Sequence, residues 1–354
     1  MRPSALKYTL VYLIPTVVAA SLAAQNEWSF AAVAFVFGLL PTIELFLKPD
    51  PHNLEAAQEA VAKQDRLYDL ILFSLVPIQW GLLLFFLVQV SATELSWVVK
   101  LGLTSAFGMA CGVLGINAAH ELGHRPTKHE QFMAKALLLT TLYLHFFIEH
   151  NRGHHKHVST DEDPASSRRG ESLYAFFVRT ITGSWRSAWK LEEHRLRKKG
   201  LPVYRLHNEM LRFQVVQLAL VALIAVVFGF DVMGWFIAAA FIGILLLETV
   251  NYIEHYGLRR KKNGDSYERP LPIHSWNSDH PLGRLILLEL TRHSDHHYLA
   301  SRKYQVLRHF DESPQLPAGY PAMMVLAFFP PLWFRVMHRE IDQLKERIGR
   351  DALA

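Results

Sequence analysis

Nineteen histidines occur in the 354 residues, and the chemistry open to this chain depends on how nine of them are spaced. Three of the four segments that carry them place two histidines four positions apart, as His120 and His124 are, which puts both imidazoles on one face of a helix. Neutral imidazole suits iron, copper, nickel and zinc. The pattern therefore predicts a metal site. The four segments are HELGH at 120–124, HNRGHH at 150–155, EHYG at 254–257 and HSDHH at 293–297.

The predicted ligand set is larger than one metal ion requires. A structural zinc ion takes four ligands, preferably with cysteine among them. Nine imidazoles therefore indicate two metal ions, with coordination positions left open. Two such metal ions favour oxygen chemistry on an apolar substrate. The predicted ligands are His120, His124, His150, His154, His155, His255, His293, His296 and His297.

Other polar residues near these segments are expected to support the ligands or to lie outside the site. His145 stands alone in an apolar run and is expected to be a buried core residue, and His157 precedes a turn and is not expected to be a ligand. A metal-bound imidazole usually donates its second N–H to an acceptor. The candidates for that role are His274, Glu121, Glu149, Asp163, Glu254 and Asp295. The alternative for each carboxylate is a solvated or ion-paired side chain.

The elements that position these residues are predicted to be membrane helices. Hydrophobic residues make up 51% of the chain and charged residues 19%, which is more apolar than a soluble domain usually is. A spanning helix needs roughly 20 mostly apolar residues. A second apolar window follows the first closely, so the first is predicted to be an uncleaved span rather than a signal peptide. The six windows are 8–24, 29–47, 70–91, 98–118, 211–230 and 234–253.

The positive charges predict how the spans are oriented. The links QNEW, SATELS and FDVMG contain no Lys or Arg, whereas the other connections are basic. The positive-inside rule then places both termini and all four histidine segments in the cytoplasm. The apolar stretch 132–148 must for this reason enter and return rather than cross. We predict one all-α domain, 1–354, in which a membrane bundle carries a cytoplasmic helical cap, mainly 119–210 and 254–354.

The source of electrons and the nature of the partners follow from what the chain lacks. Its one cysteine, Cys111, lies in the fourth window, and no CxxC pair is present to hold an iron–sulfur cluster. Electrons must therefore come from outside the chain. The basic loops are expected to face anionic lipid headgroups, and no nucleic-acid partner is predicted.

The histidine segments and the sequence around them resemble one enzyme family. HELGHR, EHNRGHHKHVSTDEDPASSR, NYIEHYGLRR and TRHSDHH are similar to the histidine boxes of the bacterial membrane alkane 1-monooxygenases, within the fatty acid desaturase and hydroxylase superfamily. The resemblance covers most of the chain. It implies six transmembrane helices in the bacterial inner membrane and a non-haem centre of two iron ions held by the nine histidines. It also implies hydroxylation of medium- to long-chain n-alkanes to 1-alkanols with O2 and electrons from rubredoxin, which its reductase reduces.

The resemblance also suggests residues for substrate and partner. Val36 falls where a channel-facing side chain controls chain length, the alternative being a valine that faces lipid. Thr291 stands where the family usually has glutamine, which bears on the wall near the metals. Basic residues on the cytoplasmic face are expected to dock an acidic rubredoxin, unless they only set the topology. They are Arg125, Lys128, Lys156, Arg168, Arg169, Arg259 and Arg260.

Two other classes of function remain open from the sequence. A desaturase or a xylene-type side-chain hydroxylase would use the same metal site on another lipophilic substrate. A membrane metal transporter or sensor would need polar residues along a path through the spans. The six windows contain few such residues besides Glu44 and Glu248, which disfavours this class.

Overall fold

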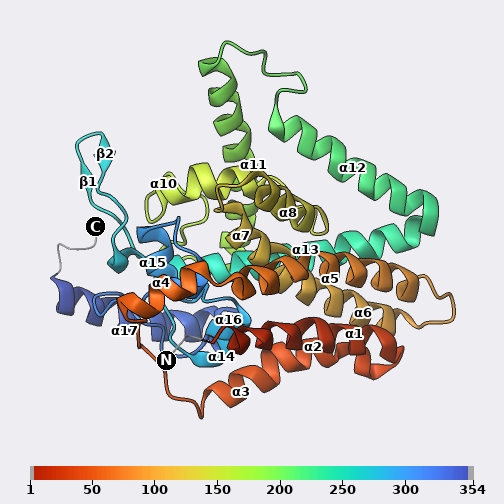
Figure 1. Cartoon of the computed structure of the whole chain (residues 1–354), viewed down its shortest axis with the longest axis horizontal. Helices are drawn as coiled ribbons and strands as arrows, with labels where there is room; N and C mark the ends of the chain where they lie inside the picture. Colours follow the sequence, from red (N-terminus) through yellow and green to blue (C-terminus); the bar gives the residue numbers. More distant parts are fainter. Residues whose placement is uncertain (1–3, 350–354) are drawn as a thin grey trace.

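The structure is a computed structural model that describes residues 4–349, and these residues are almost entirely helical. Six helical stretches are long and apolar enough to cross a membrane, which confirms the predicted number of spans. Apart from Glu209–Phe228, they run side by side through one half of the molecule (Figure 1). The second span ends at Glu44 rather than at residue 47. The six stretches are Ala5–Ala24, Glu27–Glu44, Arg66–Val90, Trp97–Gly123, Glu209–Phe228 and Phe230–His255.

Several spans are built from more than one kind of helix. The first begins as the 3-10 helix η1 (Ala5–Tyr12) and continues as α1 (Leu13–Ala24). The fourth is interrupted by a π-helical turn, and such turns are frequent at functional sites. Its parts are α6 (Trp97–Ala110), η4 (Cys111–Ile116) and α7 (Asn117–Gly123). The second consists of η2 (Glu27–Phe30), α2 (Ala31–Ala34), the π-helical η3 (Phe35–Leu39) and α3 (Leu40–Glu44).

The remaining spans are the continuous helices α5 (Arg66–Val90), α12 (Glu209–Phe228) and α13 (Phe230–His255). Helix α12 diverges from the others (Figure 1), and many of its apolar side chains, such as Val226 and Val227, are exposed. Because an exposed apolar helix of this length is unstable in water, it is expected to face lipid.

Small residues allow the fourth and sixth spans to pack closely. A Cβ atom on Gly243 would lie 2.4 Å from Cβ of Cys111, and one on Gly108 would lie 2.6 Å from Ile242. Glycine permits such a close approach between membrane helices, where packing rather than hydrophobic burial drives association. Both of these spans run on into histidine segments, so their contact fixes the relative position of His120 and His255.

The polar half of the molecule is made of shorter helices and one small hairpin. Strands β1 (Lys262–Asn263) and β2 (Ser266–Tyr267) pair antiparallel, with Lys262 opposite Tyr267. The helices are α4 (Ala56–Gln64), α8 (Lys128–Leu139), α9 (Phe146–Glu149), η5 (His150–His154), α10 (His155–His157), α11 (Leu173–Lys198), η6 (Pro272–His274), α14 (Pro281–Ile286), α15 (His293–Tyr298), η7 (Tyr304–Val306), α16 (Tyr320–Ala327) and α17 (Pro330–Ile348).

The apolar stretch 132–148 does not form a span. Helix α8 ends at Leu139, and the chain reverses through Leu142, which has a positive φ of 53°, before α9 begins. Polar side chains of neighbouring spans form hydrogen bonds with this reversal: the buried Gln79 donates to Thr140, and the partly buried Gln217 accepts from the backbone N–H of Leu144. A helix break among membrane helices requires such partners, because water cannot supply them. The structure thus agrees with the prediction that this stretch enters and returns.

Candidate metal centre

Four segments of the chain bring the nine predicted histidines to one place. Helix α7, the end of the fourth span, carries His120, and His124 is its C-cap. His255 is the last residue of the sixth span. The other six histidines come from η5 and α10, which follow α9 directly, and from α15. Two spans therefore supply one side of the centre, and helices of the polar half close it from the other.

The nine histidines form two groups in which the candidate ligand atoms all lie within 4.8 Å of one another. The larger group is His120, His124, His150, His155 and His296. The smaller group is His154, His255, His293 and His297. His145 and His157 belong to neither group, as expected from the sequence.

The Nε2 atoms within each group are spaced as ligands of one cation would be. In the larger group the Nε2 atoms of His120 and His296 are 2.9 Å apart, and those of His124 and His150 are 3.0 Å apart. In the smaller group the Nε2 atoms of His293 and His297 are 2.9 Å apart. Two nitrogens bound to one metal at about 2.1 Å and at right angles would be separated by about 3.0 Å.

Hydrogen bonding among the imidazoles cannot account for these contacts. Four Nε2 contacts of 2.9 to 3.1 Å join the five histidines of the larger group into one chain. A neutral imidazole nitrogen carries either one proton or one lone pair, so each Nε2 makes one hydrogen bond and at most two of the four contacts can be satisfied. A shared cation satisfies all five nitrogens. The donor set therefore fits a metal ion in each group.

Burial keeps most of these imidazoles in the neutral form that a metal requires. It lowers the pKa of His124 to about 3 and, together with the neighbouring histidines, holds the pKa values of His150, His155, His296 and His297 well below their usual range. A metal ligand must be deprotonated before it binds. These rings do not have to lose a proton to bind at physiological pH.

Asp163 orients one ligand ring as the sequence predicted. His154 and Asp163 are both buried, and Nδ1 of His154 lies 2.9 Å from Oδ2 of the carboxylate. Ser166 donates to the same oxygen, and the backbone N–H of Ala165 donates to Oδ1. Although burial raises it, these contacts hold the pKa of Asp163 down at about 2. The carboxylate therefore fixes the proton on Nδ1 of His154 and turns Nε2, which has no hydrogen-bond partner, into the smaller group.

Two further carboxylates lie against the groups in other ways. Glu254 accepts a hydrogen bond from Tyr320, and its second oxygen is 3.3 Å from Nε2 of His293. It thus approaches the inward nitrogen of that ring rather than the outward one. Oε1 of Glu149 is buried without a hydrogen-bond partner, and burial together with Asp163 raises its pKa to about 8.

The side chains of three residues are not hydrogen-bonded to a predicted ligand ring, which corrects the prediction made for these side chains. Glu121 accepts from Arg125 and from the backbone of Tyr304, and Asp295 pairs with Arg302. His274 turns Nδ1 to the backbone N–H of Leu271. Within residues 4–349 none of these three side chains is hydrogen-bonded to one of the nine histidines. They instead bond to nearby residues of their own segments, and Glu121 alone of the three also reaches a distant one, Tyr304, in the contacts described.

An apolar cavity of about 920 Å³, including its open mouth, ends at the histidines. His120 and His150 of the larger group and His293 of the smaller group are part of its lining. The remainder comes mainly from apolar side chains of the first, second, fourth and sixth spans, Val36 among them, and from residues in and beside α14 and α16. Val36 therefore faces the cavity and not lipid. Thr291 is buried outside this lining, so its expected place in the substrate-side wall is wrong.

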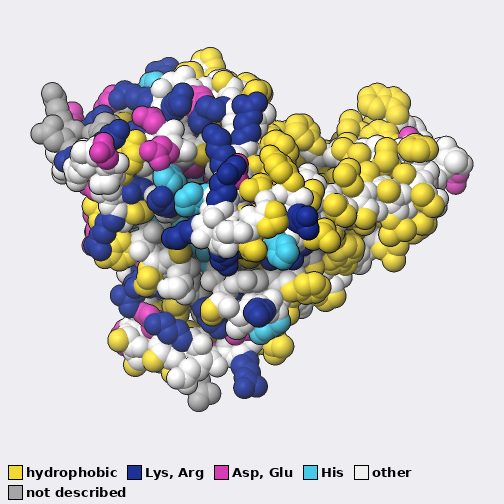
Figure 2. Space-filling model, turned by 90° about the horizontal axis from the view of Figure 1, so that it is seen from above, with side chains coloured by type: hydrophobic (Ala, Val, Ile, Leu, Met, Phe, Trp, Pro, Cys, Tyr) yellow, Lys and Arg dark blue, Asp and Glu magenta, His cyan; other side chains and the backbone are white. Residues whose placement is uncertain are grey.

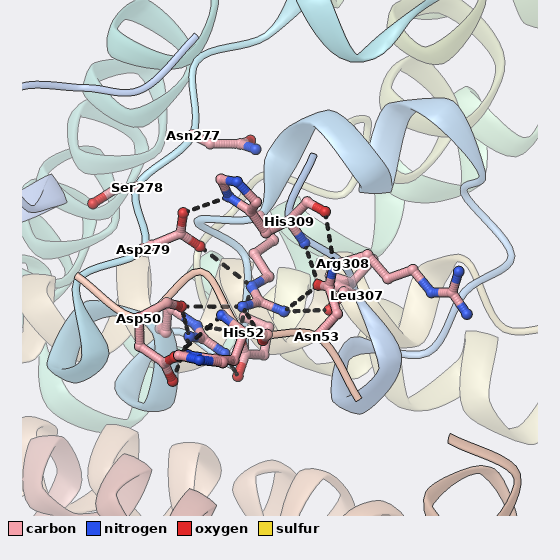
Figure 3. A network of polar contacts seen from close by, with 12 residues as sticks. Asp50, His52, Asn53, Asn277, Ser278, Asp279, Leu307, Arg308 and His309 are labelled. Carbon is pink, nitrogen blue, oxygen red and sulfur yellow. Dashed lines mark hydrogen bonds and ion pairs between the residues drawn. The ribbon is translucent and has the colours of Figure 1, made fainter. Parts of the chain in front are cut away.

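A polar network holds helix α15 against a loop for which the sequence predicted no role. Arg292, directly before His293, donates to the backbone carbonyls of His52 and Leu307. Asp279 accepts from His309, whose backbone is also bonded to Asn53 (Figure 3). These contacts tie the segment after the second span to the helix that carries three of the histidines. More than 200 residues separate His52 from Arg292 and Asn53 from His309, and no motif connects them.

The basic residues expected to dock a partner differ in exposure. Arg125 is buried in ion pairs with Glu121 and Asp69, and Arg260 is buried against backbone carbonyls. Arg259 is only 17% exposed and donates to the carbonyl of Ser167. For these three the docking prediction is wrong, because their charges are used inside the fold. The exposed residues are Lys128, Lys156, Arg168 and Arg169.

Figure 2 shows Lys and Arg side chains gathered at one end of the molecule, with histidines among them, and an apolar surface over the other end. The apolar end is the one towards which the spans extend in Figure 1. This division is typical of a protein that is partly embedded in lipid.

Comparison with known proteins agrees with the site. The profile of the family described as Fatty acid desaturase matches residues 95–327. Alkane 1-monooxygenase 1 of Pseudomonas aeruginosa is 43% identical over 317 residues, which are 89% of this chain and 83% of that protein. The chain belongs to the alkane 1-monooxygenase family. The alkane 1-monooxygenase of Acinetobacter baylyi is 39% identical over 88% of this chain and 77% of its own length.

Membership of the alkane 1-monooxygenase family confirms the resemblance seen in the sequence and makes the chain a multi-pass membrane oxidoreductase with a metal centre. A more distant relative has a different name. The xylene/toluene monooxygenase hydroxylase component of Pseudomonas putida is 29% identical over 97% of this chain and 92% of its own length.

Proposed function

We propose that this enzyme hydroxylates the terminal methyl group of medium- to long-chain n-alkanes to give 1-alkanols, using O2 and two electrons. The observation that carries the proposal is the apolar cavity, because it ends on histidines from both groups. A cavity between membrane helices can admit a substrate that is dissolved in lipid. An alkyl chain lying in it would have one end at the histidines and the rest among the spans.

The nine histidines would hold two iron ions, five at one and four at the other. When bound, iron supplies the redox chemistry with O2 that an alkane needs, since a methyl group has no acidic proton or leaving group for a side chain to act on. The chain does the rest. Its apolar lining binds and aligns the alkyl chain, the buried histidine environment excludes water, and Asp163 keeps the proton of His154 on the outward nitrogen.

The small side chain of Val36 supports a preference for medium to long alkanes. It belongs to the π-helical turn η3 and lines the cavity together with Ile14, Val113 and Leu246 from the three other spans. A larger side chain at this position would shorten the space for the alkyl chain. The distance from the methyl end to Val36 would then set the longest substrate that fits.

Rubredoxin, reduced by its reductase, is the proposed electron donor. Lys128, Lys156, Arg168 and Arg169 are exposed on the polar half of the molecule, the half that carries the histidines. An acidic protein would be steered to such a surface. This arrangement also supports a location in the bacterial inner membrane with the metal centre and both termini in the cytoplasm, because basic segments are retained on that side.

The test is product analysis in bacterial cells that lack their own alkane oxidation and express the enzyme with rubredoxin and rubredoxin reductase. Individual n-alkanes of increasing length are supplied, and 1-alkanols are measured by gas chromatography with mass spectrometry. We expect 1-alkanols from medium and long alkanes, and none from a His154→Ala variant that is produced to the same level. Subterminal alcohols, or no oxidised product at any length, would contradict the proposal.

A second substrate class is a methylarene, and the 29% identical xylene/toluene relative is the observation that favours it. The same cells would then convert a methylarene to the benzylic alcohol faster than any alkane to its alcohol. A desaturase outcome would be seen as alkenes or unsaturated acyl chains in the same extracts. Family membership leaves no support for a metal transporter or sensor.

A further inference from the structure

Glu44 is a carboxyl group placed where the apolar cavity meets a second pocket. It ends the second span, is 2% exposed, and belongs to the lining of both spaces. The second pocket, called here the outer pocket, has an empty volume of about 670 Å³ including open solvent, and Leu45, Pro49, His280 and Ala322 are among its lining residues. Glu44 therefore stands between the proposed alkane site and the segments that follow the second span.

One oxygen of this carboxyl group is held and the other is free. Oε1 accepts a hydrogen bond of 2.6 Å from the backbone N–H of Gly283 in the first turn of α14. Oε2 is buried and has no hydrogen-bond partner. A buried polar atom without a partner is costly, by more than a typical hydrogen bond contributes. Capping of α14 explains Oε1 and leaves Oε2 without a role in the fold.

Two glycines make room for the carboxyl group. A Cβ atom on Gly319 would lie 1.8 Å from Oε2 of Glu44, and one on Gly283 would lie 3.1 Å from Oε1. The φ of Gly319 is −64°, which any residue can adopt, so the backbone does not require glycine there. The close approach of the carboxyl oxygen requires glycine at this position. The segment before α16 is thus shaped around Glu44.

The same segment connects Glu44 with the metal centre. Tyr320 follows Gly319 and donates to Glu254, whose other oxygen is beside Nε2 of His293. Tyr320, Glu254 and Glu44 all belong to the lining of the apolar cavity. A hydroxyl group formed near His293 could therefore form hydrogen bonds with polar side chains between the histidines and the outer pocket. An alkane has no group that can form such bonds.

We propose that Oε2 of Glu44 accepts a hydrogen bond from the hydroxyl group of the primary alcohol, and that the alcohol leaves through the outer pocket. The inference rests on the proposed function, since it names the route of that reaction's product. The alkane enters among the apolar spans, and the product is drawn away from them because it carries a hydrogen-bond donor. Substrate and product would in this way use different ends of one cavity.

The test compares binding of 1-decanol and n-decane to the purified, metal-loaded enzyme in detergent, by displacement of labelled n-decane. We expect the ratio of alcohol affinity to alkane affinity to fall about tenfold in Glu44→Met, since one hydrogen bond is lost. Gly319→Ala should lower the ratio similarly, because the new methyl group displaces Oε2 while the Gly283 contact can persist. The second variant keeps the test valid if Glu44→Met folds poorly.

Val36→Ala is the matched control, because it changes an apolar wall of the cavity and should shift both affinities in parallel. Ala322→Trp would fill the outer pocket, and we expect it to slow dissociation of 1-decanol more than that of n-decane. An unchanged affinity ratio in both Glu44→Met and Gly319→Ala, or unchanged alcohol dissociation in Ala322→Trp, would overturn the inference. If the wild type forms no 1-alkanol in cells, the proposed function itself fails, and the two failures are thus distinguishable.

Discussion

Replacing Asp163 with asparagine tests whether a carboxylate orients the metal centre. Three donors meet this side chain: Nδ1 of His154 and the Ser166 hydroxyl at Oδ2, and the backbone N–H of Ala165 at Oδ1. An amide has one oxygen and one NH2 group. If the NH2 replaces Oδ2, two donors lose their acceptor and His154 must move its proton to Nε2. If the NH2 replaces Oδ1, only the Ala165 N–H is left unsatisfied.

The second orientation is therefore preferred, and its free-energy cost comes from the unsatisfied N–H of Ala165. A buried N–H without an acceptor should lower the free energy of unfolding by about 1 to 3 kcal/mol. The bond from His154 to a neutral oxygen is also weaker than the bond to a carboxylate, and loss of such a support typically reduces metal affinity about 10- to 100-fold. We expect the Asp163→Asn enzyme to bind one of its metal ions more weakly within this range.

The assay is the iron content of purified enzyme, measured by mass spectrometry after equilibration with a graded series of iron chelators. Glu162→Gln is the matched control, because it removes the same charge one position earlier from a side chain that is 58% exposed and contacts His157, not a predicted ligand. The wild type and this control should release iron at the same chelator strength. Two iron ions held with wild-type affinity by Asp163→Asn would refute the reasoning.

Three further predictions concern the cavity, the bundle and the partner. Val36→Trp should shift the longest hydroxylated n-alkane to a shorter chain, measured as 1-alkanol yield against chain length, and an unchanged profile would mean that the alkyl chain does not pass this side chain. Gly243→Val should lower the free energy of unfolding by about 1 to 3 kcal/mol, because its Cβ would overlap Cys111. Thermal denaturation in detergent measures this effect. A melting temperature equal to that of the wild type would mean that the close contact is absent. Replacing Lys156 and Arg168 with glutamate should raise the KM for rubredoxin several-fold and weaken its dependence on salt, whereas a flat salt response of the wild type would argue against electrostatic docking.

The nine histidines could be proposed as candidate ligands from the sequence because their signal is local. Spacing of three or four positions on a helix, repeated in separate segments beside apolar windows, requires no knowledge of the tertiary structure. The six spans could be predicted in the same way, because a run of about 20 apolar residues is typical of a membrane-spanning helix. Asp163 lay close enough to His154 in the sequence to be proposed correctly as its partner.

Residues whose role depends on exposure or on the direction in which a side chain points were harder to assign. Arg125 and Arg260 have the same charge as Lys156, and only the folded chain shows that the two arginines are buried. Glu121 and Asp295 are adjacent to ligands in the sequence, yet their side chains turn to Arg125 and Arg302. A neighbouring position on a helix faces another direction, so adjacency along the chain does not imply contact.

The sequence by itself determined which residues can bind metal and which segments can cross a membrane, because both depend on residue type and short-range spacing. The tertiary structure decided how the nine histidines divide into groups of five and four, and that an apolar cavity connects them with Val36. It also placed Glu44, which the sequence marked only as a polar residue in an apolar window, between two pockets. Such arrangements arise from packing between segments that are far apart in the sequence, and short-range pattern carries no information about them.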